Sequence, residues 1–264
     1  MADLTDGSLI HPLSVVDPTA RIAPGVVIGP YSVIGSDVEI EEGCWIGPHV
    51  VIQGKTRIGR NNRIFQFASL GAEPQDKKYK AELTALQIGS GNTIREYVTI
   101  NRGTVQDEGV TRIGRDNWIM AYVHIAHDCR VGNSTVLANN ANLAGHVHID
   151  DYVTLGGATL IHQFCHIGEH AFTAYGARIN KDVPPFMMVG EGKAHPRGLN
   201  VEGLKRRGFS DERLQALKEA YRILYRSDLS LELAIEQLQP LEGASEDVTR
   251  LREFLEESGR SIVR

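Results

Sequence analysis

Residues 26–52 read VVIGPYSVIGSDVEIEEGCWIGPHVVI, and every sixth residue from Ile28 to Ile52 is an isoleucine. This spacing extends over most of the chain, with interruptions after Leu70 and Ile100. The period matches neither the turn of a helix nor the simple alternation of a strand. It predicts a short strand followed by a corner, with the repeated side chain pointing inward. The inward positions are Ile10, Val16, Ile22, Ile28, Ile34, Ile40, Ile46, Ile52, Ile58, Ile64, Leu70, Ile88, Ile94, Ile100, Ile113, Ile119, Ile125, Val131, Leu137, Leu143, Ile149, Leu155, Ile161, Ile167, Thr173 and Ile179.

Three sides of six residues close a triangular coil of 18 residues, and coils stack as parallel strands about 4.8 Å apart. The inward positions therefore predict an all-β, left-handed parallel β-helix of roughly nine coils, about 43 Å long. Glycine often follows the inward residue, as at Gly29 and Gly47, and we expect it to supply unusual backbone angles at the bend. A β-sandwich is the alternative, but it needs a turn signal about every 8–12 residues and does not hold one phase for so long.

The β-helix is expected over residues 1–190, with loop insertions at about 71–87 and 103–111 where the period is interrupted. Insertions of a solenoid lie on its surface and often build its binding face. Residues 191–264 are expected to form a small α-helical domain that covers the open end of the solenoid. Its helices are predicted to begin after Ser210, Ser230 and Ser245, and the last to end at Gly259.

The composition narrows the class of protein. Hydrophobic residues make up 42% of the 264 residues, yet no apolar run approaches the ~20 residues of a membrane span. The N-terminus has no basic segment followed by an apolar one, so we expect no secretory signal. Three cysteines are too few for a disulfide framework, which favours a reducing cytoplasm. The net charge of −5 argues against nucleic acid as a general partner.

Residues 18 apart in the sequence are expected to lie one above another, roughly 5 Å apart. This spacing places His127 under Gly145, and Asp128 under His146. A histidine with a neighbouring carboxylate can accept a proton at physiological pH, and a backbone N–H beside it can bind a developing oxyanion. The predicted cluster contains His124, His127, Asp128, Gly145, His146, His162 and Gln163.

Other candidate residues have plainer interpretations. His148 and His166 are expected to be solvated surface histidines, and Cys129 to be a packed inward residue rather than a nucleophile. Two basic runs, at residues 77–80 and 205–207, are either solvated surface or phosphate contacts, and the planar fork of arginine suits a diphosphate. No P-loop, G-x-S-x-G or dinucleotide glycine motif is present.

Several stretches resemble the acyl-ACP–UDP-N-acetylglucosamine O-acyltransferases, which start lipid A synthesis in Gram-negative bacteria. The resemblance covers almost the full chain, and its most specific part is the run from Asn200 to Phe209. The matching stretches are Ile125-Ala126-His127-Asp128, Leu143-Ala144-Gly145-His146-Val147, His162-Gln163-Phe164-Cys165, Asn200-Val201-Glu202-Gly203-Leu204-Lys205-Arg206-Arg207-Gly208-Phe209, Gln75-Asp76-Lys77-Lys78-Tyr79 and Arg102-Gly103-Thr104-Val105-Gln106.

The resemblance implies a homotrimer with sites between subunits, no metal and no cofactor. The reaction would move an (R)-3-hydroxyacyl group from acyl carrier protein to the 3-hydroxyl of UDP-N-acetylglucosamine. His127 would be the general base, supported by Asp128, and the N–H of Gly145 would bind the oxyanion. The implied substrate-binding residues are Gln75, Asp76 and Lys78 at the glucosamine end, His124, His146, His162 and Gln163 along the substrates, and Asn200, Glu202, Arg206 and Arg207 at the nucleotide end.

Tyr175 occupies the position that resembles the family's hydrocarbon ruler. It lies 48 residues after His127, which is about 2.7 coils or roughly 13 Å along the axis, a distance that roughly ten carbons span. We therefore expect a preference for acyl chains of about 10–12 carbons, although Tyr175 packed at a corner is the simpler interpretation. Two departures from the family, Asn101 for a histidine and residues 81–84 for Gly-Glu-Pro-Thr, concern the sugar contacts.

The sequence leaves three alternatives to this function. The N-acyltransferase of the same pathway has a separate N-terminal domain before its hexapeptides, whereas here the period begins by Ile10. A γ-type carbonic anhydrase is also a trimeric β-helix and binds zinc through three interface histidines. A catalytically inactive scaffold would leave the histidine cluster without an explanation.

Overall fold

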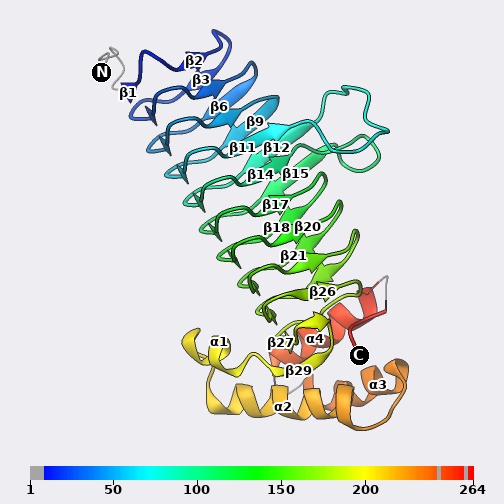
Figure 1. Ribbon diagram of the computed structural model, residues 1–264. Helices are drawn as coiled ribbons and strands as arrows, with labels where there is room; N and C mark the ends of the chain where they lie inside the picture. The colour runs from blue at the N-terminus through cyan, green and yellow to red at the C-terminus, as the bar shows by residue number, and fades with distance from the viewer. Residues whose placement is uncertain (1–8, 243–244, 259–260) are drawn as a thin grey trace.

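The computed structural model describes residues 9–242, 245–258 and 261–264, and it shows a three-sided β-helix followed by a helical domain (Figure 1). The chain visits sheets A, B and C in turn, and these contain 11, 10 and 8 strands. Sheet A consists of β1 (Leu9–Ile10), β4 (Val27–Ile28), β7 (Trp45–Ile46), β10 (Arg63–Ile64), β13 (Thr93–Ile94), β16 (Trp118–Ile119), β19 (Val136–Leu137), β22 (Thr154–Leu155), β25 (Phe172–Thr173), β27 (Met187–Val189) and β29 (Pro196–Leu199). Sheet B consists of β2 (Val15–Val16), β5 (Val33–Ile34), β8 (Val51–Ile52), β11 (Ser69–Ala72), β14 (Thr99–Asn101), β17 (His124–Ile125), β20 (Asn142–Leu143), β23 (Leu160–Ile161), β26 (Ala177–Ile179) and β28 (Gly192–Lys193). Sheet C consists of β3 (Arg21–Ile22), β6 (Val38–Ile40), β9 (Lys55–Ile58), β12 (Ala85–Ile88), β15 (Val110–Ile113), β18 (Arg130–Val131), β21 (His148–Ile149) and β24 (His166–Ile167).

The strand register confirms the 18-residue coil. Ile28 pairs with Ile46, and His124 pairs with Asn142, in parallel ladders. The repeated aliphatic side chains form one continuous core, and Ile46 and Ile125 are fully buried in it. The only antiparallel pair of named strands in the described chain is β27 with β29, where the solenoid ends. The predicted fold is therefore confirmed.

The expectation about glycine is wrong in its mechanism. The left-handed backbone angles belong to the residue three positions after the inward one, and these residues are mostly not glycine, for example Tyr97 (φ 58°) and His146 (φ 62°). Apart from Gly71 (φ 76°), the described glycines directly after an inward residue have no positive φ. A Cβ on Gly114 would lie 2.4 Å from the carbonyl oxygen of Gly132, and one on Gly156 would lie 2.5 Å from that of Thr173. Glycine is needed there because the next coil passes too close for a side chain.

The outer faces of the three sheets differ in polarity. Sheet C presents a column of charged and polar side chains that includes Arg112 and Arg130, adjacent in register. Sheets A and B present large apolar side chains, such as Trp118 (45% exposed) and Leu160 (47% exposed). The outer faces of sheets A and B are therefore more apolar than that of sheet C.

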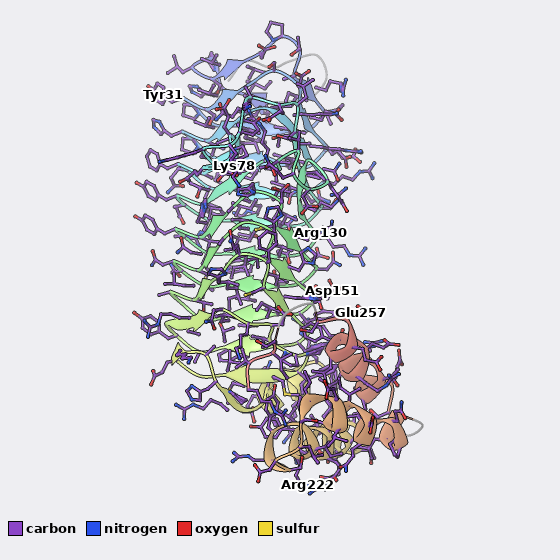
Figure 2. All side chains as sticks on the ribbon, turned by 90° about the vertical axis from the view of Figure 1, so that its right-hand side faces the viewer. Tyr31, Lys78, Arg130, Asp151, Arg222 and Glu257 are labelled. Atoms are coloured by element: carbon purple, nitrogen blue, oxygen red, sulfur yellow. The ribbon has the colours of Figure 1, made fainter. Side chains whose placement is uncertain are left out.

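A stack of aromatic rings runs along the corner between sheets A and B. Its members are exposed, and successive ring centroids are 4.9–5.1 Å apart. The rings belong to Tyr31, His49, Phe67, Tyr97 and Tyr122. Figure 2 shows Tyr31 at the outer side of the solenoid, away from Arg130.

Both insertions leave the solenoid at the corner between sheets B and C. Residues 73–84 connect β11 to β12, and residues 102–109 connect β14 to β15, and both project from one side of the solenoid (Figure 1). The first is shorter than predicted because β12 begins at Ala85 and pairs along its whole length with β9. Because both insertions leave from this corner, they lie beside the side chains that the following coils place at the same corner.

In its described residues the C-terminal domain contains four helices: α1 (Val201–Arg206), α2 (Asp211–Arg226), α3 (Leu231–Glu242) and α4 (Glu246–Glu257). Ser210 and Ser230 cap α2 and α3 as predicted, since their hydroxyls accept from the N–H groups of Arg213 and Leu233. Ser245 precedes α4 but makes no such bond, and Gly259 lies outside the described residues. The short α1 was not predicted. No described helix has both the length and the apolar character that crossing a membrane requires.

The helical domain is fixed to the last coils by polar and aromatic contacts. The ring of Phe254 in α4 lies 4.6 Å from that of His166, and Arg250 forms an ion pair with Glu169 at 3.3 Å. The buried Asp182 accepts hydrogen bonds from Ser258 and from the N–H of His166. The domain therefore covers the end of the solenoid, as expected (Figure 1).

Candidate functional site

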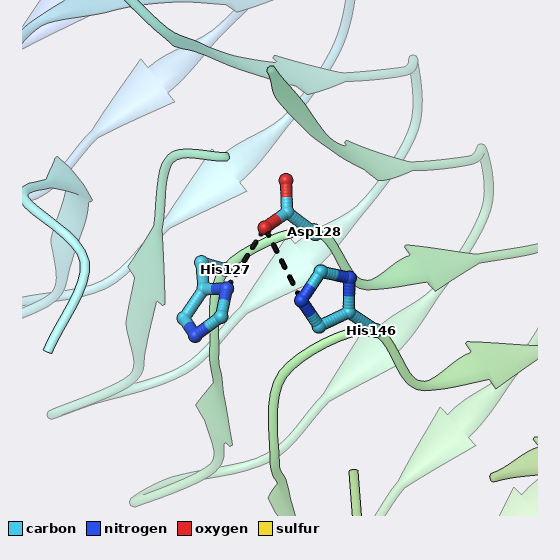
Figure 3. Close-up of side chains that lie close together, drawn as sticks. All are labelled: His127, Asp128 and His146. Carbon is cyan, nitrogen blue, oxygen red and sulfur yellow. Dashed lines mark hydrogen bonds and ion pairs between the residues drawn. The ribbon is translucent and has the colours of Figure 1, made fainter. Parts of the chain in front are cut away.

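The centre of the site is a histidine–carboxylate pair at the corner between sheets B and C. The Nδ1 of His127 lies 2.8 Å from Oδ2 of Asp128 (Figure 3). An ionised carboxylate only accepts hydrogen bonds, so Nδ1 carries the proton and Nε2 has the free lone pair. The His127 side chain is 17% exposed and that of Asp128 1%. The pair therefore directs a basic nitrogen outward from a rigid corner.

Asp128 is held by the second insertion. Its two oxygens accept from the N–H of Thr104 at 2.8 Å and from the hydroxyl of Thr104 at 2.6 Å, and its own N–H donates to Thr111. Burial alone raises the pKa of the Asp128 carboxyl, but the bonds from His127 and Thr104 outweigh it and hold the pKa below its usual value. Asp128 is thus kept as a carboxylate that orients His127.

Gly145 lies directly above His127, as the coil spacing predicted. A Cβ at this position would lie 2.6 Å from Cε1 and 2.8 Å from Nε2 of His127, so only glycine leaves the ring in place. Among the described residues the N–H of Gly145 donates to no other group. A backbone donor and a basic nitrogen are therefore adjacent.

His146 is fixed beside this pair. Its ring stacks on Phe164 at 4.4 Å and meets the ring of His127 edge-on at 5.2 Å. Its Nδ1 lies 2.9 Å from Oδ2 of Asp107, and its Nε2 lies 3.8 Å from Oδ2 of Asp128. Sequence analysis missed Asp107, because the path of an insertion is not set by the repeat.

The other predicted histidines lie around the same corner. His124 is half-buried on β17 and its Nδ1 contacts the hydroxyl of Thr99 at 2.7 Å. Burial, and secondarily the neighbouring His127, lower the pKa of His124 and keep it neutral. His162 and Gln163 are exposed two coils above, where Nδ1 of His162 contacts the carbonyl oxygen of Gln163.

The first insertion carries Gln75, Asp76 and Lys78. The N–H of Lys78 donates to the carboxylate of Asp76, which closes a turn. Arg102 fixes this loop by donating to the hydroxyl of Tyr79 and to the carbonyl oxygen of Gly71, both at 2.9 Å. The loop therefore leaves the same corner as His127, two coils earlier, with Gln75 and Lys78 exposed.

Asn101 is buried at the base of the first insertion. Its Nδ2 donates to the carbonyl oxygen of Glu73 at 2.8 Å. The residue that departs from the family pattern thus holds the loop backbone, and its Oδ1 is buried without a hydrogen-bond partner in the described chain.

The predicted nucleotide-end residues lie at another corner, between sheets C and A. Arg207 places its guanidinium 4.4 Å from the ring centroid of Tyr152 and donates to the carbonyl oxygen of Ser134. Asn200 caps α1 by accepting from the N–H of Gly203, and it also donates to the carbonyl oxygen of His170. Within one protomer, therefore, this group and His127 lie on opposite edges of sheet C.

Glu202 and Arg206 are both exposed on α1, two residues after Asn200 and one before Arg207. No described residue buries these two side chains, so they are open to a ligand.

Tyr175 lies at the third corner, between sheets A and B. It is 74% exposed, and its ring packs beside Gly157. The separation from His127 therefore has a lateral component that the rise along the axis leaves out. Beside it, a groove on the outer face of sheet B is lined by Leu160, His162, Arg178 and Lys193.

The interpretation of Cys129 as a packed inward residue agrees with the structure. This residue is fully buried, its thiol donates to the carbonyl oxygen of Ala144, and burial raises its pKa to about 12. A nucleophilic thiolate is therefore excluded at neutral pH. His166 is not simply solvated, because its Nε2 lies 2.8 Å from Asp150 and its ring contacts Phe254.

His127, Asp128 and His146 place ligand atoms within 4.8 Å of one another, which is close enough to consider a metal. However, Oδ2 of Asp128 already accepts from His127 and Thr104. The donor set is that of an orienting carboxylate with its histidine, which favours acid–base chemistry over coordination.

The fold and site define a class, the hexapeptide-repeat acyltransferases. A family model described as bacterial transferase hexapeptide (six repeats) matches residues 37–72 and 111–145. A second, described as UDP N-acetylglucosamine O-acyltransferase, domain 2, matches residues 182–263, which include the last strands and the four helices.

Individual relatives agree over nearly the full chain. The acyl-[acyl-carrier-protein]–UDP-N-acetylglucosamine O-acyltransferase of Janthinobacterium sp. (strain Marseille) is 58% identical over 97% of this chain and 100% of its own length. The structure of LpxA from Acinetobacter baumannii superposes with a TM-score of 0.95, at 47% identity, covering 97% of this chain and 100% of that one. The UDP-N-acetylglucosamine acyltransferase of Francisella novicida also has a TM-score of 0.95, at 44% identity, with 97% and 94% covered. The chain belongs to the acyl-[acyl-carrier-protein]–UDP-N-acetylglucosamine O-acyltransferase family and is an O-acyltransferase.

Proposed function

We propose that this enzyme transfers an (R)-3-hydroxyacyl group from acyl carrier protein to the 3-hydroxyl of UDP-N-acetylglucosamine, the first step of lipid A biosynthesis. The observation that carries the mechanism is the bond between Nδ1 of His127 and Asp128, which leaves Nε2 of His127 as a base beside the free N–H of Gly145. The proposal agrees with the names of the relatives.

In the proposed reaction, Nε2 of His127 takes the proton of the sugar 3-hydroxyl as the oxygen attacks the thioester carbonyl. The C–O bond forms, and the N–H of Gly145 donates to the resulting oxyanion. The tetrahedral intermediate then expels the thiolate of the carrier, which takes the proton from His127. The thioester is already activated, so one positioned base suffices without a cofactor or covalent enzyme intermediate.

Acyl transfer to a panel of acceptors tests this function. With hydroxyacyl carrier protein as donor, we expect product from UDP-N-acetylglucosamine and none from a UDP-glucosamine whose free amine is the acceptor. Amide formation on the second substrate would instead indicate the N-acyltransferase of the pathway. Metal analysis of the active protein tests the carbonic anhydrase alternative.

The polar groups around the two corners are proposed as substrate contacts. Gln75, Asp76 and Lys78 bind the glucosamine end, and His124, His146, His162 and Gln163 line the path of the substrates. Asn200, Glu202, Arg206 and Arg207 bind the nucleotide end, where two guanidinium groups suit a diphosphate.

A homotrimer accounts for the separation of these two groups. In a cyclic trimer each contact joins two different surfaces. If sheet A of one protomer packs on sheet B of the next, the corners between A and B meet at the three-fold axis. The C/A corner with Arg206 then lies beside the B/C corner with His127 of the neighbouring protomer. The apolar faces of sheets A and B and the exposed aromatic stack support this packing.

Complementation tests the shared site. Neither His127→Ala nor Arg206→Glu should be active alone, the second because a carboxylate repels the diphosphate. Co-expressed subunits should form mixed trimers that each contain one intact site, restoring activity. If both groups act within one protomer, mixing restores nothing. Analytical ultracentrifugation of the wild type checks the trimer itself.

We propose that the acyl chain lies between sheets B and A of neighbouring protomers, and that Tyr175 at the axial corner limits its length to about 10–12 carbons. A steric stop discriminates more sharply than burial, since two methylenes alone are worth only about 15-fold. Tyr175→Gly should shift the best donor toward 14 carbons in kcat/KM. A wild type that already prefers 14 carbons, or an unchanged profile in the variant, contradicts the assignment. The three free, buried cysteines suit the reducing cytoplasm in which we place the reaction.

A further inference from the structure

Asp107 is a carboxylate of the second insertion that reaches the active-site corner. It lies 39 residues before His146 in the sequence, and its Oδ2 is 2.9 Å from Nδ1 of that histidine. The side chains are 30% and 14% exposed, respectively, so the contact is partly shielded from water. Charge-assisted hydrogen bonds of this kind are stronger than neutral ones.

This bond determines which nitrogen of His146 carries a proton. A carboxylate accepts and does not donate, so Nδ1 of His146 must be the donor. Nε2 is then directed toward Asp128, 3.8 Å away, on the same side as the ring of His127 (Figure 3). Phe164 stacks on one face of the ring, and Asp107 and Asp128 lie near its two nitrogens, so the ring is held from three sides.

The insertion that carries Asp107 is itself fixed at both sides of that residue. Thr104 binds both oxygens of Asp128. Glu108 forms ion pairs with Arg112, at 2.9 Å, and with Arg130, two neighbouring residues of the charged column on sheet C. Residues 104, 107 and 108 therefore place the loop over the two imidazoles, and only Asp107 touches His146.

We propose that Asp107 is a positioning residue of the acyl-transfer site, which fixes the tautomer and ring orientation of His146 against the His127–Asp128 pair. The inference rests on the proposed function and extends it, because the position belongs to none of the motifs that carry the family resemblance. Asp107 would touch neither the sugar hydroxyl nor the thioester, and it would act through His146.

The test compares Asp107→Asn with Asp107→Ala in the full-length enzyme. Asparagine retains an acceptor for Nδ1–H and should keep activity within a few-fold of wild type. Alanine should lower kcat/KM about tenfold, the effect of losing one hydrogen bond to a charged group. Its thermal midpoint should stay near that of wild type, because the bond lies at the edge of the fold. If alanine does not fold, Asp107→Ser, whose hydroxyl is too short to reach His146, replaces it.

A double-mutant cycle separates positioning from a general loop effect. In a His146→Ala background, Asp107→Ala should have no further effect on kcat/KM, because its only proposed route is through that ring. Additive losses overturn the proposal, as does an unaffected single Asp107→Ala variant. Glu108→Gln is the matched control for the loop, and its loss should be the same with or without His146. A wild type inactive with UDP-N-acetylglucosamine would instead refute the proposed function.

Discussion

His146 and His170 occupy the same position of the repeat at two different corners, and their surroundings make them different groups. Each is the left-handed residue of its corner, with φ 62° and 58°. His146, between sheets B and C, has a carboxylate near each nitrogen. His170, between sheets C and A, is 7% exposed among Tyr152 (4.7 Å), Phe209 and Phe186. Burial lowers the pKa of His170 to about 4, with a smaller contribution from Arg207.

The difference lies in what covers each corner, not in the backbone. The B/C corner is covered by polar insertions, which bring Asp107 and Thr104 to the rings. The C/A corner is covered by the helical domain, which brings Phe209 and Arg207. A regular solenoid therefore provides equivalent positions, and the non-repeating segments decide which of them becomes a candidate active site and which becomes a structural core.

The largest expected effect is at the polar corner. His127→Ala should lose about 10²–10⁴-fold in kcat, because it removes the proposed general base, while the protein stays folded. Cys129→Ser, two residues after His127 and buried, should keep most activity. Steady-state assays with circular dichroism check both. A dead cysteine variant beside an active histidine variant would show that the general-base mechanism is wrong.

The next effect is a pH dependence at the aromatic corner. The pKa of His170 is depressed in the fold, so the unfolded chain binds a proton more readily, and stability falls as the pH drops from about 6.5 to about 4. The loss from this group is about 3 kcal/mol. His170→Phe should remove that part of the acid sensitivity while leaving activity at neutral pH unchanged. Urea unfolding at fixed protein concentration, compared between the two proteins across this range, measures it. Parallel curves would contradict the assignment.

The sequence predicted the fold and two adjacencies of the candidate site for one physical reason. The repeat fixes the register, so the adjacency of His127 to Gly145 and of Asp128 to His146 follows from spacing alone. It does not fix insertions, and Asp107 was therefore missed. The repeat also does not show why a position requires glycine. In the structure these glycines are needed for close packing between coils, as at Gly114.

The remaining errors concern the lateral direction. The rise per coil gave the axial distance from His127 to Tyr175 but did not show that the two residues lie at different corners.

The short α1 has too few residues for a helical period, so Asn200 was interpreted only as a ligand residue, although its side chain also caps that helix. Residues whose roles depend on segments outside the repeat could not be placed from the repeat.

The smallest effects distinguish Arg206 from Arg207, two neighbours that the sequence treats alike. Both are proposed to contact the diphosphate, so alanine at either should raise KM for UDP-N-acetylglucosamine a few-fold with little change in kcat, as expected for contacts made equally in ground and transition states.

Only Arg207 also packs on the aromatic corner, with its guanidinium 4.4 Å from the ring of Tyr152. Such a contact is worth about 0.5–1 kcal/mol when partly exposed. Arg207→Ala should therefore also lower the urea midpoint, whereas Arg206→Ala, the matched control, should not. Tyr152→Leu should reproduce the lower midpoint and remove the further effect of Arg207→Ala on it. An unchanged KM in both arginine variants would show that the pair is ordinary solvated surface, and an equal loss of stability in both would show that the stacking on Tyr152 contributes nothing specific.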